Sequence, residues 1–93
     1  MRIIGEIPHD LMKITVFKMN DKLSIKFEHD LLEQIIKFRA GSPVCDLETA
    51  KAFVTNNLNQ IIVSNMEKVS VYRGEVLNKM NKENQGMGFP EII

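Results

Sequence analysis

Apolar and polar side chains alternate in the first part of the chain. Residues 22–28 read KLSIKFE, in which every second side chain is apolar. Because successive side chains of a strand point to opposite faces of a sheet, this segment predicts a strand with one buried face. Residues 12–19, MKITVFKM, are rich in β-branched and aromatic side chains and predict a second strand directly before it.

The residues 20–21, Asn-Asp, separate these two strands. Both residue types tolerate the left-handed backbone conformation that a two-residue hairpin turn requires. A turn at this point places Val16 opposite Ile25, and it also places Ile14 opposite Phe27. The apolar side chains of both strands then share one face, so turn chemistry and alternation predict the same register.

Residues 31–39, LLEQIIKFR, fit the period of a strand and that of a helix. We interpret them as a strand, because the segment is short and ends at AGSP. A tight connection before it places Ile36 beside Ile25 and Phe38 beside Leu23, on the apolar face.

Residues 2–7, RIIGEI, predict an additional strand, although Gly5 weakens it and its pairing stays open. The strands within residues 2–39 therefore form an antiparallel meander of three or four strands. Its predicted core face carries Ile14, Val16, Leu23, Ile25, Phe27, Ile36 and Phe38.

A long apolar stripe at helical spacing follows the break at residues 40–45, AGSPVC, and Asp46 is a suitable N-cap for it. The stripe predicts one amphipathic helix over about 46–81, packed on one face of the sheet. A kink or break between Ser64 and Ser70 is the alternative, because KVSVYRG alternates like a strand. The stripe consists of Leu47, Ala50, Val54, Leu58, Ile61, Ile62, Val69, Tyr72, Val76 and Met80.

The predicted fold is thus a single α+β domain over residues 1–82. Residues 83–93 are polar and then contain glycine and proline, which predicts a mobile C-terminal tail.

Composition and charge narrow the classes of function. The 93 residues include 12 basic and 12 acidic side chains, so the chain has no overall field that would attract nucleic acid or an anionic membrane. A domain of this size leaves little room for a deep active-site cleft. No apolar run approaches the roughly 20 residues that span a bilayer, and the first residues lack the apolar core of a secretory signal. We expect a cytoplasmic protein without a membrane partner.

The tripeptide HDL occurs at residues 9–11 and 29–31 and contains both histidines. We interpret both copies as turns that precede strands. An adjacent His-Asp pair supplies two ligands in metal-dependent phosphohydrolases, but such sites need further ligands. Because the turns before the first and third strands of a meander lie at the same end of the sheet, a metal-binding hydrolase stays open as an alternative. Its ligands would be His9, Asp10, His29 and Asp30.

No other stretch predicts catalysis or a cofactor. Cys45 precedes the helix, where a thiol can be activated, but the sequence places no base beside it. There is no GxSxG elbow and no glycine-rich phosphate loop. We therefore expect a protein that is not an enzyme and holds no metal or cofactor.

The outer face of the sheet offers another function. Single-stranded nucleic-acid binders combine basic side chains with stacking aromatics. Lysines on strands also keep sheets soluble and edges unpaired, so this face predicts nucleic-acid binding only as an alternative. Its residues are Lys13, Phe17, Lys26, Lys37 and Arg39.

The length of the helix favours a protein-interaction module. A helix of this length extends about 50 Å, whereas strands of seven residues cover only about 23 Å. The sheet cannot cover the C-terminal half, and an exposed apolar stripe marks a partner surface. We expect a homodimer formed through the helix, or a complex with another protein. The contact residues would be Val69, Tyr72, Val76 and Met80.

Overall fold

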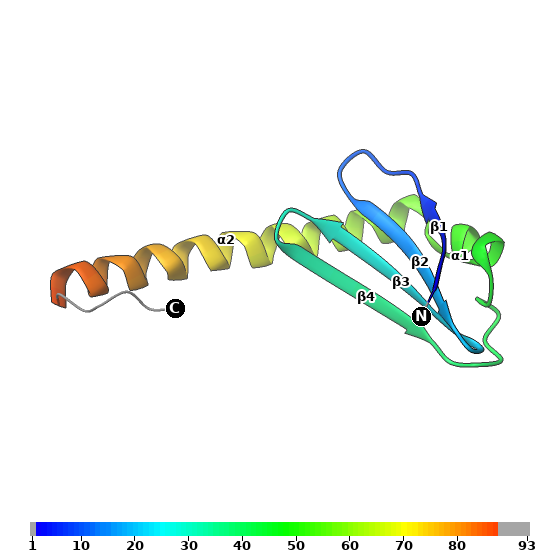
Figure 1. Cartoon of the computed structure of the whole chain (residues 1–93). Helices are drawn as coiled ribbons and strands as arrows, with labels where there is room; N and C mark the ends of the chain where they lie inside the picture. The colour runs from blue at the N-terminus through cyan, green and yellow to red at the C-terminus, as the bar shows by residue number, and fades with distance from the viewer. Residues whose placement is uncertain (1, 88–93) are drawn as a thin grey trace.

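The fold is an antiparallel four-stranded sheet followed by two helices, as a computed structural model describes it for residues 2–87 (Figure 1). The α+β class and the long C-terminal helix are confirmed. Residues 83–87, expected in the tail, belong to that helix, and residues 88–93 lie outside the described residues. The elements are β1 (Arg2–Ile7), β2 (Lys13–Met19), β3 (Lys22–His29), β4 (Leu32–Phe38), α1 (Leu47–Phe53) and α2 (Asn56–Met87).

Neighbouring strands in the sheet are also neighbours in the chain, in the order β1-β2-β3-β4. The predicted register is confirmed: Val16 pairs with Ile25 and Ile14 with Phe27. Across the next hairpin, Ile25 pairs with Ile36. The first residue of each tight turn has a positive φ, 56° for Asn20 and 55° for Asp30. The two turns therefore use residue types that tolerate the left-handed region.

The strand β1 completes the sheet and pairs antiparallel with β2. The pairing register shifts between Ile3 and Gly5. A Cβ atom at Gly5 would lie 2.6 Å from the Leu47 side chain of α1. The glycine that weakens the strand pattern therefore permits the close approach of α1 to the sheet.

The single helix expected over 46–81 is divided at Val54 and Thr55. Asp46 caps α1 as predicted, in a capping box with Thr49. Thr55 then starts α2, because its Oγ1 accepts a hydrogen bond from the Leu58 N–H (3.2 Å). The kink considered between Ser64 and Ser70 is wrong, since α2 is continuous there.

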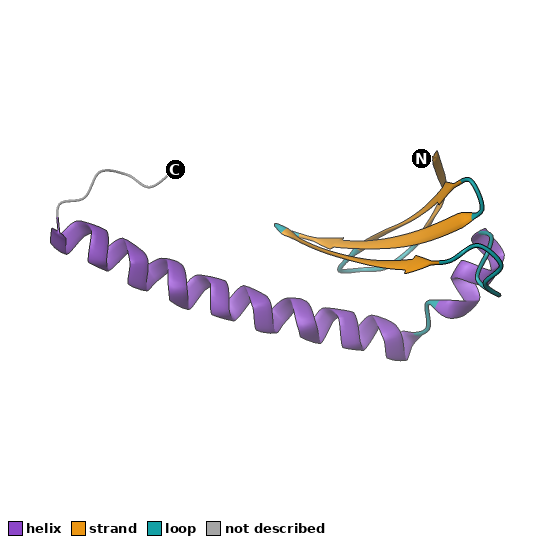
Figure 2. Ribbon diagram, turned by 90° about the horizontal axis from the view of Figure 1, so that it is seen from below, coloured by secondary structure: helices purple, strands orange, loops and turns teal. Residues whose placement is uncertain are grey.

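Both helices lie on one face of the sheet (Figure 2). The predicted core residues of β2 and β3 are all buried, whereas Ile36 and Phe38 of β4 are half-buried. The Phe38 ring contacts the Phe53 ring edge to face, with centroids 4.9 Å apart. The buried core comprises Met12, Ile14, Val16, Leu23, Ile25, Phe27, Ala50, Val54, Ile62 and Met66.

The molecule is elongated because α2 continues past the end of the sheet (Figures 1 and 2). Its principal extents are 54 × 27 × 18 Å, and its radius of gyration is 17.8 Å. A compact domain of this length has a radius of gyration of about 12 Å. Part of α2 therefore has no cover from the other described residues.

We expect Phe27→Ala to lower the free energy of unfolding by about 3–5 kcal/mol, because the side chain is fully buried and the substitution leaves a cavity. Chemical denaturation followed by circular dichroism measures this change. Val71→Ala, at a position 61% exposed, is the control and should change stability by less than about 0.5 kcal/mol. An unchanged midpoint for Phe27→Ala would show that the core face is assigned wrongly.

The cap of α1 should make stability depend on pH. A hydrogen bond from the Thr49 N–H lowers the pKa of Asp46, and the Thr49 hydroxyl and the charge of Lys18 lower it further. The cap therefore contributes fully above the ordinary aspartate pKa of about 3.9, and its contribution is lost as the pH falls through the lowered value.

Asp46→Asn keeps a capping side chain without a titrating group. We expect the thermal midpoint of the wild type to fall more than that of Asp46→Asn between neutral and strongly acidic pH. Parallel midpoints over the whole range would contradict the role of the Asp46 charge.

Candidate functional site

The part of α2 beyond the sheet carries the predicted partner residues. Ile62 and Met66 are the last residues of α2 in the buried core. After them, Val69 is 50% exposed, Tyr72 68% and Met80 41%, whereas Val76 is half-buried. We call residues 69–82 the arm. Spacings of three and four residues bring these side chains to one side of the helix, where they extend the buried stripe into solvent.

The apolar surface of the arm is wider than the sequence analysis indicated. Leu77 is 47% exposed and follows Val76 directly in the chain, three residues before Met80. The four predicted residues already satisfied the helical period, and Leu77 lies at the edge of their stripe. In the sequence, only the apolar side chain of Leu77 indicated that it belongs to this surface.

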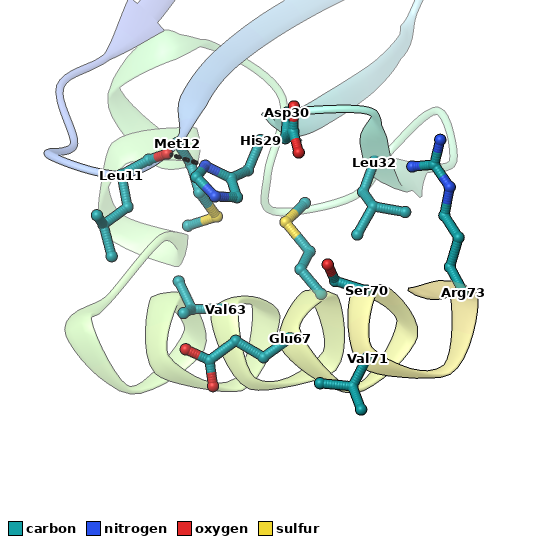
Figure 3. Close-up of a pocket in the computed structure, with 11 residues that line it drawn as sticks. Leu11, Met12, His29, Asp30, Leu32, Val63, Glu67, Ser70, Val71 and Arg73 are labelled. Atoms are coloured by element: carbon teal, nitrogen blue, oxygen red, sulfur yellow. Dashed lines mark hydrogen bonds between the residues drawn. The ribbon is translucent and has the colours of Figure 1, made fainter. Parts of the chain in front are cut away.

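A groove of about 420 Å³ lies at the root of the arm, between α2 and the connections that precede β2 and β4 (Figure 3). Apolar side chains, among them Leu11, Leu32 and Met66, form part of its wall. The polar side chains around it are His29, Asp30, Glu67, Ser70 and Arg73. A volume of this size is near the lower end of that of small-ligand pockets. The sequence did not predict the groove, because the groove forms only where α2 crosses the two connections.

The two histidines lie close to the same residue, Leu11. His9 Nδ1 accepts hydrogen bonds from the backbone N–H groups of Leu11 (3.1 Å) and Met12 (3.2 Å). His29 Nδ1 lies 2.6 Å from the Leu11 carbonyl oxygen, as the dashed line in Figure 3 shows. Because a carbonyl oxygen can only accept, His29 Nδ1 carries the proton. Both HDL tripeptides therefore help to fix the connection between β1 and β2.

This geometry limits what the histidines can offer a metal. The Nδ1 lone pair of His9 is engaged with backbone N–H groups. His29 has a free Nε2, and its Nδ1–H···O=C bond is the arrangement that orients many histidine ligands. Among the side chains that the structure describes, those of residues 2–82, no three from His, Cys, Asp or Glu come together as a possible metal site. One oriented imidazole does not make a metal centre.

The thiol of Cys45 is exposed beside the start of α1. Its backbone N–H donates to Thr49 Oγ1 (2.9 Å), and the Asp46 N–H donates to the same oxygen (3.0 Å). These bonds satisfy backbone groups ahead of the first helical turn. The sequence around Cys45 thus supplies a helix cap.

The outer face of the sheet carries the residues of the nucleic-acid alternative. Lys26 Nζ lies 5.1 Å from the centroid of the Phe17 ring and 3.1 Å from Glu28 Oε1. Glu28 pairs in register with Lys13 on one side and with Glu33 on the other. Strand alternation places both glutamates on the same face as the lysines, so this face carries acidic as well as basic side chains. Lys37 of β4 and Arg39 just after it are also exposed.

Titration of zinc into the protein should show no stoichiometric binding at micromolar concentration, because the structure orients only one imidazole nitrogen for a ligand. Isothermal titration calorimetry measures this, and the His9→Ala, His29→Ala double variant is the control. A tight site in the wild type that disappears in the double variant would contradict the interpretation of both HDL tripeptides as turns.

Among the described residues, the exposed apolar stripe of the arm and the groove beside it are the surface features that could bind another molecule. Among residues 2–87, neither helix combines the length and the apolar character that crossing a membrane requires. Comparison with protein-family models, curated proteins and solved structures gives no match.

Proposed function

We propose that the protein is a small, non-enzymatic interaction module that forms a homodimer through the arm of α2. The observation that carries the proposal is the exposed apolar stripe on the arm, beyond the end of the sheet. Removing apolar surface from water contributes about 25 cal/mol per Å². A second helix packed along the arm would bury these apolar side chains and gain this free energy. The sheet cannot bury them, because it ends before the arm.

A second copy of the chain is a suitable occupant for three reasons. Two-fold pairing is the commonest mode of self-association, and it lets each arm cover the other. The formal net charge is zero, so two copies experience no net repulsion. The two arms have equal length, so a two-fold pair can align them along their whole length.

An antiparallel pair of arms matches the positions of the stripe residues. Centred between Arg73 and Val76, it places Val69 beside Met80 of the second copy. Apolar side chains then meet at both ends of the contact.

A non-enzymatic role is supported by the positions of the groups that could do chemistry. The Nδ1 atoms of His9 and His29 are engaged with the backbone, and Thr49 is used by the cap of α1. An amphipathic helix of another protein could cover the same stripe. The outer face offers less to single-stranded nucleic acid, since Lys26 lies over Phe17 and glutamates stand among the lysines.

Light scattering at micromolar concentration should give a mass twice the 10.7 kDa of one chain. Tyr72→Glu and Val76→Glu should each shift the mass toward that of the monomer, because a buried carboxylate at the contact is costly. The helical circular-dichroism signal should stay unchanged in both variants.

Val71→Glu is the matched control. This valine lies in the same arm and is 61% exposed, but five residues of helix turn it roughly 140° away from Val76. It should leave the dimer intact. A wild-type monomer, or equal dissociation by Val71→Glu and Val76→Glu, would refute the dimer through the arm.

A further inference from the structure

The two edges of the sheet differ in a way that bears on association. At the β1 edge the register shifts between Ile3 and Gly5, and Leu47 of α1 packs against Gly5. Such irregularities protect an edge against pairing with another strand. The β4 edge has a regular register over all seven residues, and no other element of the part of the chain that the structure describes lies beyond it (Figure 1). The β4 edge is therefore open to a further strand.

The turn geometry shows which backbone groups of β4 are free. His29 and Leu32 flank the two-residue turn and pair with each other, so the backbone of Leu32 is directed toward β3. Hydrogen-bonding direction alternates along an antiparallel strand. The N–H and C=O groups of Glu33, Ile35 and Lys37 therefore point away from the sheet, along the open edge.

The side chains of these three residues form a self-complementary row. All three lie on the outer face, opposite Glu28, Lys26 and Ser24 of β3, and all three are exposed. Ile35, in the middle, is 47% exposed. An acidic residue stands two positions before the isoleucine, and a basic residue stands two positions after it. When such a row meets a second copy in the antiparallel direction, each acid faces a base.

We propose that β4 pairs antiparallel with β4 of a second copy, with Ile35 opposite Ile35. In this register Glu33 of each copy faces Lys37 of the other. The free backbone groups of all three residues hydrogen-bond across the two-fold axis. The two sheets then form one continuous sheet with the helices of both copies on the same face.

The side chains select this register among those that the backbone allows. If one β4 strand is shifted along the other, the outward-pointing N–H and C=O groups of the two strands stay opposite one another only when the shift is a multiple of two residues. Both shifts of two residues separate the two Ile35 side chains. A shift toward the turn before β4 breaks both Glu33–Lys37 pairs, and a shift the other way places Glu33 opposite Arg39, which lies outside β4, and each Ile35 opposite Lys37. Opposite charges and β-branched pairs across strands are stabilising, so the unshifted pairing is preferred.

This contact is independent of the arm, because it uses β4 and no part of α2. It is therefore tested in the Val76→Glu background, where the arm is blocked. Sedimentation equilibrium up to sub-millimolar concentration should detect a dimer of the Val76→Glu protein. Glu33→Lys or Lys37→Glu added to it should weaken the dimer about tenfold or more, because two attractions become two repulsions.

Two rescue experiments identify the register. The double reversal Glu33→Lys, Lys37→Glu restores both pairs and should restore the dimer. An equimolar mixture of the two single reversals should form a mixed dimer, although each variant alone does so poorly. A helical circular-dichroism spectrum and an unchanged thermal midpoint show that each variant is folded.

The outcomes separate the two contacts. A Val76→Glu protein that is monomeric at every concentration, or a dimer that ignores the charge reversals, overturns the pairing of β4. If the wild type associates no further than Val76→Glu while the charge reversals act as expected, the arm contact fails and the β4 contact stands.

Discussion

Leu23, Ile25 and Phe27 form an apolar ridge along β3, the strand that lies between β2 and β4, and no sheet of four strands can cover such a ridge by itself. The cover has to come from helix, and it comes in two pieces. Ala50 of α1, Val54 directly after it, and Ile62 and Met66 of α2 close the core from the same side. The direction of α2, the groove at its root and the free length of its arm all follow from this contact.

The division of the helix follows from what each piece covers. α1 packs near β1, where Gly5 gives it space, whereas the first turns of α2 pack along the sheet toward the turn between β3 and β4. One straight helix cannot serve both places. The bend at Val54 and Thr55 resolves this conflict, and the hydroxyl of Thr55 satisfies a backbone N–H that the bend leaves free.

The sequence predicted the sheet in detail because two independent signals agreed. Alternation set the faces, and Asn20 and Asp30 set the turns, so a slip of one residue would have exposed the whole apolar face. It did not predict the bend, since the apolar period continues through Val54 and only the capping residue Thr55 marks the change. Val69, Tyr72 and Met80 are exposed, as the length of the helix predicted, whereas Val76 is half-buried. The groove and the open β4 edge depend on how elements meet in space, which no local pattern records.

The order of the strands has a consequence for how the chain folds. Every strand pairs with its neighbour in sequence, so the contacts of the sheet close short loops and cost little chain entropy. Low contact order of this kind is associated with fast folding. The meander can thus form before α2 docks, and Ile62 and Met66 then pack against the apolar face of the sheet. Residues 69–82 contribute no side chain to the buried core, so the core can form without a partner on the arm.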